Sequence, residues 1–211
     1  MLIPPLAANA LGLAVGFHRR GRLDPPLRWL VAYLFLCLLT TLGMVALAAV
    51  RGNNWALVHL FAPVQLLGFA WMFSGWVPGW MGRTFRWTAV SFALAWLWFL
   101  PQEDLTRFSG ISFHVQTLLM LGGSLGALFH FSLQADRPLL DHPGAWVASG
   151  LLGDMSITLV SYASRAWLLA HAPDWAFNLN LFRAMVVTLA YLCFLRALLL
   201  EPLLPLPSDG R

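Results

Sequence analysis

Long apolar runs alternate with short polar stretches along all 211 residues of the chain. Charged residues, proline or glycine bound the apolar segments, which cover 2–17, 29–50, 55–79, 86–101, 111–133, 144–170 and 178–200. A helix needs about 20 apolar residues to cross a bilayer. We therefore predict an all-α polytopic membrane helix bundle with seven transmembrane helices, or six if one of the two short segments, 2–17 or 86–101, does not cross.

The composition agrees with this pattern. Hydrophobic residues make up 59% of the chain and charged residues 10%, whereas a soluble domain carries about 25% charged residues. Residues 1–200 are predicted to form a single transmembrane domain, which leaves no room for a soluble catalytic domain. The tail 201–211 contains three prolines and is expected to be a short cytoplasmic segment that does not continue the last helix.

The positions of the basic residues predict the orientation in the membrane. All 13 of them are arginines. On one side of the membrane, the ends of the predicted helices carry Arg19, Arg20, Arg22, Arg28, Arg83, Arg86, Arg196 and Arg211. On the other side, they carry Arg51, Glu103, Asp104, Arg107 and Asp174. Since short cytoplasmic loops are enriched in basic residues, we expect an outside N-terminus, a cytoplasmic C-terminus and a multi-pass protein of the inner (plasma) membrane.

The expected partners follow from the same distribution. The arginines are scattered beside apolar runs rather than clustered on a polar face, so we expect no nucleic acid. Membrane lipids and other membrane subunits are the expected partners. Cys37 and Cys193 lie within apolar runs without metal-ligand spacing and are interpreted as core packing.

Polar residues inside the apolar runs are the candidate functional residues, because ionisable groups are costly in hydrocarbon. Asp154, Thr158, Ser161 and Arg165 follow the spacing i, i+4, i+7 and i+11, which places them on one helix face. The other candidates in the predicted spans are His59, Gln65, His114, Gln116, Asn180 and Arg183. We predict a polar pocket between the helices 55–79, 111–133, 144–170 and 178–200.

The depth of these residues indicates what the pocket binds. His59, His114, Gln116, Arg165, Asn180 and Arg183 are all expected in the outer third of the membrane. Such a pocket would open outward and favour an anionic or hydrogen-bonding ligand, because arginine offers a fixed fork of donors. The alternative is that these groups join helices by hydrogen bonds or extend to the headgroups.

Other chemistries are less well supported by the sequence. Asp154 is expected far below His59 and His114, so no metal site is predicted, and no cofactor is indicated. The residues 122–126 match the pattern G-x-S-x-G, but inside an apolar helix this pattern is better explained as a close helix contact through Gly122 and Gly126 than as a nucleophile.

The order of these features resembles a family of small bacterial seven-helix membrane proteins of uncharacterised activity. The resemblance rests on Asn53–Phe73, Phe108–Phe131 and Pro138–Leu159 and on a closing helix with Asn and Arg near its start. It implies a module similar to the membrane input modules of bacterial sensor systems. That family often has Glu where this chain has Gln65 and Gln116, so chemistry that needs those carboxylates is not implied here.

A second resemblance, to lysoplasmalogenase-like membrane hydrolases, rests on Gly150–Asp154. Those enzymes use paired carboxylates, and here Asp154 has no second acid within a predicted span. Our hypothesis is therefore a non-enzymatic module that binds a small or lipidic ligand, as a sensor or as one subunit of a larger complex. The alternatives are a lipid-acting hydrolase that uses Asp154 as acid or base, and a purely structural subunit.

Overall fold

The chain folds into an all-helical bundle. The computed structural model describes residues 3–51, 55–102, 111–133 and 138–200. The α-helices are α1 (Ile3–Arg19), α2 (Pro25–Arg51), α3 (Trp55–Trp76), α4 (Gly79–Phe99), α5 (Ile111–Leu133), α6 (Pro143–His171) and α7 (Pro173–Leu199), with short 3₁₀ helices at Leu100–Gln102 and Leu139–Asp141. The predicted fold class is therefore confirmed as helical, and no β-strand occurs in the described residues.

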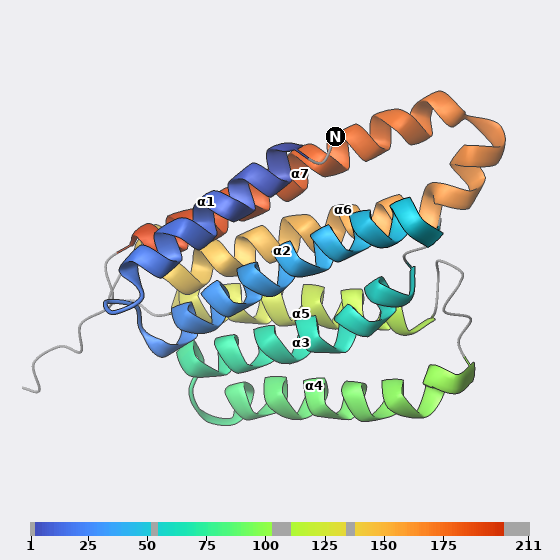
Figure 1. Ribbon diagram of the computed structural model, residues 1–211. Coiled ribbons are helices and arrows are strands. Elements are labelled where there is room, and N and C mark those ends of the chain that lie inside the picture. Colours follow the sequence, from blue (N-terminus) through green and yellow to red (C-terminus); the bar gives the residue numbers. More distant parts are fainter. Residues whose placement is uncertain (1–2, 52–54, 103–110, 134–137, 201–211) are drawn as a thin grey trace, which may run out of the picture.

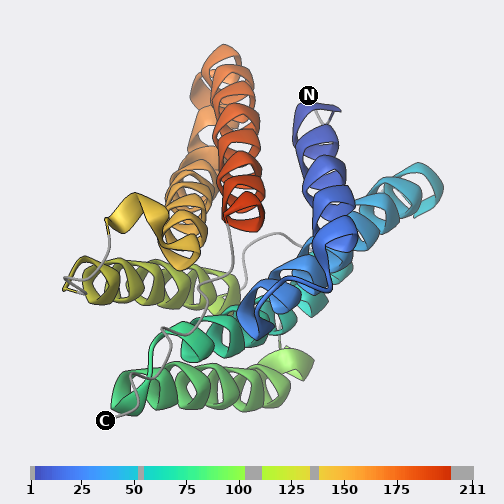
Figure 2. The same cartoon turned by 90° about the vertical axis from the view of Figure 1, so that its left-hand side faces the viewer.

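Six of these helices pack in a closed ring. In order around it, α1 contacts α2, α2 contacts α3, α3 contacts α5, α5 contacts α6, α6 contacts α7, and α7 returns to α1. Helix α4 lies outside this ring and packs mainly on α3, at the lower edge of the bundle in Figures 1 and 2.

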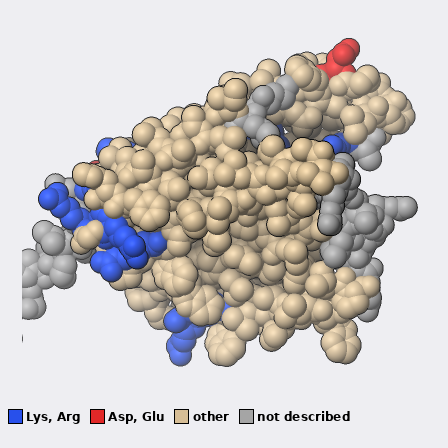
Figure 3. Space-filling model, viewed as in Figure 1, with Lys and Arg blue, Asp and Glu red and all other residues tan. Residues whose placement is uncertain are grey.

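Several helices of the ring are apolar enough to lie in a membrane. Within the described residues, four helical segments have the length and hydropathy of a membrane span: Pro25–Val50, Ala56–Trp76, Ile111–Leu133 and Pro173–Leu199. On the face shown in Figure 3, the surface between the two ends of the bundle is almost free of charged residues. Many large apolar side chains are exposed on it, which suits a hydrocarbon environment.

Two of the predicted loops are wrong, because the helices are longer than the apolar runs. Arg83 and Arg86 were expected in a loop over 80–86, but they lie in α4, which begins at Gly79. The preceding turn is tight because Gly79 adopts a φ of 79°, a left-handed conformation that glycine tolerates. Likewise α7 begins at Pro173 rather than 178, since proline fits the first turn of a helix.

A side-chain cap fixes the start of α2. The backbone N–H of Leu27 donates to Asp24 Oδ1 at 3.2 Å, and the indole Nε1 of Trp76 donates to Asp24 Oδ2 at 3.2 Å. Asp24 thus caps α2 and joins it to the end of α3. Other charged residues used for the predicted orientation, Glu103, Asp104, Arg107 and the tail 201–211, lie outside the described residues.

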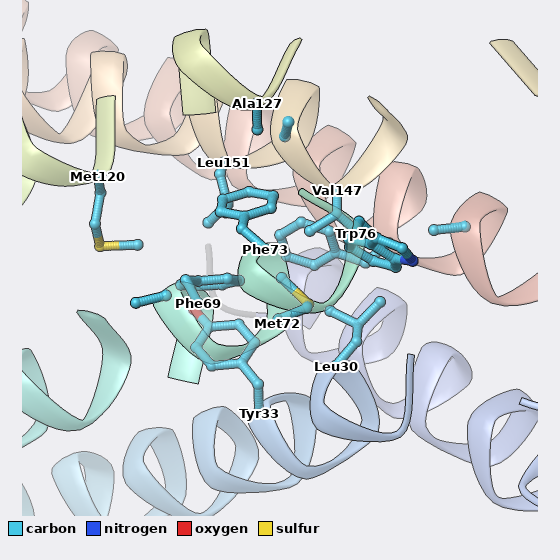
Figure 4. Packing of buried hydrophobic residues seen from close by; sticks show 14 of the residues in the cluster. Leu30, Tyr33, Phe69, Met72, Phe73, Trp76, Met120, Ala127, Val147 and Leu151 are labelled. Atoms are coloured by element: carbon cyan, nitrogen blue, oxygen red, sulfur yellow. The ribbon is translucent and has the colours of Figure 1, made fainter. Parts of the chain in front are cut away.

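A core of large apolar side chains joins α2, α3, α5 and α6 (Figure 4). Tyr33 of α2 packs against Phe69 of α3, with ring centroids 4.3 Å apart. Near the start of α6, His142 stacks on Phe131 of α5 at 4.1 Å and accepts a hydrogen bond from the Gly144 N–H at 3.0 Å. These contacts hold one end of the bundle together.

The predicted close contact through Gly122 and Gly126 is only partly present. A Cβ at Gly122 would meet no atom within 4 Å, and one at Gly126 would meet the flexible end of Met81 at 3.0 Å. A close helix contact lies at Gly150 instead, where a Cβ would be 2.8 Å from the Phe194 ring and 3.0 Å from the Ala190 carbonyl oxygen. Gly150 is therefore the glycine that brings α6 and α7 together.

Candidate functional site

A cavity of about 450 Å³ lies between the six helices of the ring and is partly open to the outside. Side chains from α1, α2, α3, α5, α6 and α7 line it, and none of the lining residues comes from α4. We call this space the central cavity. Its walls combine apolar surface with charged, hydroxyl, thiol and amide groups, which is the usual mixture in a small-molecule site.

The charged groups of the central cavity are Asp154 of α6 and Arg183 of α7. Asp154 Oδ1 accepts a hydrogen bond from the Thr158 hydroxyl at 3.3 Å. The guanidinium carbon of Arg183 lies 4.8 Å from the centre of the Tyr162 ring, a cation–π contact. Tyr162 in turn packs edge-on against Phe113 of α5, with centroids 5.1 Å apart. The aromatic rings of Tyr162 and Phe113 therefore hold the side chain of Arg183 in place.

A second group of polar side chains lines the central cavity from α1, α2 and α7. Tyr33 and Cys37 lie one turn apart on α2, and the hydroxyl of Tyr191 lies beside the Cys37 thiol. Asn9 of α1 lies beside Tyr191. Asn9 is 1% exposed, and its Oδ1 has no hydrogen-bond partner. A buried acceptor without a partner is costly, so Asn9 marks this part of the wall as a place for a donor.

Hydrogen bonds through two glutamine side chains connect the cavity wall with the core, and we call this chain of bonds the amide relay. Gln65 Nε2 donates to the Tyr33 hydroxyl at 2.9 Å, and Gln116 Nε2 donates to Gln65 Oε1 at 2.9 Å. Gln116 also reaches Met120 Sδ at 3.3 Å and is 1% exposed. Gln65 is one of the residues that line the cavity. Gln116 does not line it, but its hydrogen bond orients the side-chain amide of Gln65.

The structure brings half of the predicted site residues to the central cavity. Those that line it are Gln65, Asp154, Thr158, Asn180 and Arg183. Those that do not are His59, His114, Gln116, Ser161 and Arg165. The helices α1 and α2 contribute to the wall, in addition to the four that the sequence indicated.

The residues outside the lining have different surroundings. His59 is buried and 4% exposed, and Ser161 is buried with its hydroxyl oxygen unpartnered. Arg165 is exposed at the far end of the polar face of α6. The shared face of α6 therefore divides: Asp154 and Thr158 face the cavity, whereas Arg165 lies at the surface of the bundle.

Sequence reasoning missed Asn9, Tyr33 and Cys37 as site residues. Tyr33 and Cys37 have the i, i+4 spacing of one helix face, and Asn9 is a polar residue within an apolar segment. These signals were present, but Cys37 was interpreted as core packing. Tyr191 of α7, which also lines the cavity, is likewise absent from the predicted site residues.

Within the part of the chain that the structure describes, no three His, Cys, Asp or Glu side chains lie close enough together to hold a metal ion. The arrangement is suited to binding through hydrogen bonds and charge. Comparison with models of protein families, with curated proteins and with solved structures finds no match for this chain.

Proposed function

We propose that this chain is a multi-pass protein of the inner membrane that binds a small molecule in the central cavity, as a sensor-like module or a ligand-binding subunit of a larger complex. One observation carries this proposal: a cavity of about 450 Å³ in an apolar bundle is lined by a carboxylate, a guanidinium and unpartnered polar atoms. Binding pockets for small molecules have volumes of about 300 to 1,000 Å³.

The energetics favour a ligand over a purely structural role. Asn9 Oδ1 and Arg183 Nε are buried and lack hydrogen-bond partners. An unpaired buried polar group costs about 1–3 kcal/mol, and two of them border the same cavity. A ligand that hydrogen-bonds to these groups recovers that free energy.

The same groups speak against the hydrolase alternative. A general acid–base pair needs two titratable groups beside the reacting bond. Asp154 is the one carboxylate among the described residues that line the central cavity. The paired carboxylates of the hydrolase alternative are therefore not found there, which favours a binding role.

The proposed topology has all of α1 to α7 crossing the membrane, with the N-terminus outside. Arginine side chains gather at the end of the bundle where α1 turns into α2 (Figure 3). The Nη1 of Arg19 at that end donates to the Leu198 carbonyl at 2.7 Å, which joins the ends of α1 and α7. By the bias of basic residues toward the cytoplasm, this arginine-rich end faces the cytoplasm.

The test is to fill the cavity without removing a polar group. Ala184 of α7 lines the central cavity, whereas Ala32 of α2 is exposed on the outside of the bundle. We expect a small molecule to co-purify with the wild-type protein and with Ala32→Leu, and to be at least tenfold depleted in Ala184→Leu. Mass spectrometry of extracts from the purified proteins measures this.

A co-purifying molecule that is equally abundant in all three proteins would place its site elsewhere. Recovery of bulk lipid alone from each protein would exclude a resident ligand and leave a structural role.

A further inference from the structure

The two charges on the wall of the central cavity are of opposite sign. The sequence places two arginines, Arg165 and Arg183, at a shared pocket, which would favour an anionic or hydrogen-bonding ligand. The structure places Arg183 on the cavity and leaves Arg165 exposed outside its lining, while Asp154 lies on the wall. Among the described lining residues, the formal charges therefore sum to zero.

These charges lie at nearly the same level. A Cβ at Gly153 of α6 would be 3.7 Å from Val186 Cγ1 of α7, so these two positions face each other. Asp154 follows Gly153 directly, and Arg183 precedes Val186 by three positions. Because α6 and α7 run antiparallel, the two charged residues are thus about two residues, roughly 3 Å, apart along the α6–α7 pair.

Both groups have capacity for a further partner. Arg183 is held by its contact with the Tyr162 ring, and its buried Nε has no hydrogen-bond partner. Asp154 accepts one hydrogen bond from Thr158, whereas a carboxylate has about four acceptor sites. The unpartnered Asn9 Oδ1 adds another acceptor to the same cavity. The wall therefore offers donors at Arg183 and acceptors at Asp154 and Asn9.

Charge balance then selects the ligand. Asp154 and Arg183 attract each other across the cavity, so their charges balance before a ligand binds. A ligand with a single negative or positive charge would add a net charge to this balanced pair in an apolar bundle, which is strongly unfavourable. A molecule that carries both signs compensates each wall charge and adds no net charge to the bundle.

We propose that the ligand of the central cavity is a zwitterion, with its acidic group bound by Arg183 and its ammonium group bound by Asp154. This inference rests on the proposed function and specifies its ligand class. The shared chemistry, an ammonium with a carboxylate or phosphate in one molecule, occurs both in free amino acids and in the ethanolamine headgroup of a phospholipid.

The first experiment compares matched probes on the purified full-length protein. Leucine and phenylalanine are the free zwitterions, and phosphoethanolamine is the soluble headgroup. N-acetyl-leucine keeps only the negative charge, and leucinamide keeps only the positive charge. We expect at least one zwitterion to bind about 10 to 100 times more tightly than either singly charged analogue, because each lost partner removes a charge-assisted hydrogen bond. The concentration-dependent rise of the melting temperature measures binding.

A lipid arm distinguishes the two sources. The protein is placed in nanodiscs that contain either phosphatidylethanolamine or phosphatidylglycerol, in an otherwise identical lipid mixture. Retention of phosphatidylethanolamine with no response to soluble zwitterions assigns the site to a lipid headgroup. A response to soluble zwitterions without lipid preference assigns it to a free small molecule.

Variants test the assigned roles. In Arg183→Gln the zwitterion should lose its advantage over leucinamide, and in Asp154→Asn it should lose its advantage over N-acetyl-leucine. Arg165→Gln and Asp174→Asn remove charges outside the cavity lining and should keep the wild-type order of affinities. The probe series on the wild-type protein decides the question even if a variant does not fold.

The outcomes separate this inference from the proposed function. Binding of a singly charged analogue as tight as that of the best zwitterion would overturn the zwitterion assignment and leave a ligand-binding cavity. The same holds if a molecule that depends on the cavity co-purifies and carries one charge or none. Failure of every probe and lipid, together with no molecule depleted by Ala184→Leu, would overturn both.

Discussion

Single residues in this bundle serve the core and the central cavity at once. Tyr33 lines the cavity, its ring packs on Phe69, and its hydroxyl accepts the hydrogen bond of Gln65. Gln116 completes this arrangement from α5. Two glutamines in apolar runs could be identified from the sequence as candidate site residues, but their direct contact between α3 and α5 could not.

The amide relay predicts energetic coupling between Gln65 and Gln116. Gln65→Leu and Gln116→Leu should each lower the free energy of unfolding by about 1 kcal/mol, because each variant loses an interhelical hydrogen bond that contributes about this much. The double variant should lose less than the sum of the two, by about 0.5 kcal/mol or more, because both changes break the same bond. Denaturation in mixed micelles measures the free energy of unfolding of the wild-type protein, the two single variants and the double variant, which together form a double-mutant cycle.

A second double-mutant cycle, which pairs Gln65 with a residue outside the amide relay, provides the control. Thr84 is exposed on α4 and donates to the carbonyl of Trp80 in its own helix. Gln65→Leu and Thr84→Val should therefore be additive. Additivity of the two glutamine variants as well would show that the relay contributes no stability.

At the scale of elements, glycine positions decide which helices approach closely. The spacing of Gly122 and Gly126 is typical of close helix contacts, yet α4 lies outside the ring and leaves Gly122 open. Gly150, which has no such spacing with Gly153, lies against the backbone of α7. The reason is that a glycine permits a close approach, but the partner that comes close is set by the packing of the whole bundle.

This difference predicts opposite responses to the same substitution. Gly150→Ala should destabilise the protein by about 1–3 kcal/mol, because the new Cβ overlaps the Phe194 ring and the Ala190 carbonyl. Gly122→Ala should be neutral or stabilise by less than about 1 kcal/mol, since it gains helix propensity in open space. Thermal unfolding of both variants in detergent measures the two effects. Equal losses at the two positions would contradict the close packing of α6 on α7 through Gly150.

At the scale of the molecule, the ring of six helices decides which polar residues share a space. Helices α1 and α7 are far apart in the sequence but adjacent in the ring, which brings Asn9 near Tyr191. Helix α4 packs outside and contributes no residue to the cavity lining. The gathering of arginines at one end of the bundle supports the proposed orientation (Figure 3).

Orientation can be tested by labelling the two ends. Gly21, between α1 and α2, and Asp174, near the start of α7, are both exposed. In intact cells a membrane-impermeant maleimide should label Asp174→Cys but not Gly21→Cys, and opening the cells should expose both. The wild-type protein, with its native Cys37 and Cys193, gives the background. Labelling of Gly21→Cys in intact cells would reverse the orientation, and labelling of both would exclude a membrane between the two ends.

The sequence by itself determined the class of the fold and roughly where each helix lies, because hydrophobic runs of bilayer length permit little besides helices. It also identified Asp154, Thr158, Gln65, Asn180 and Arg183, because polar groups in such runs need a partner. The tertiary structure alone decided that these residues meet Asn9, Tyr33 and Cys37 in one cavity and that Arg165 does not join them. Helical periodicity assigns a residue to a face, but the order of helices around the ring determines what that face meets.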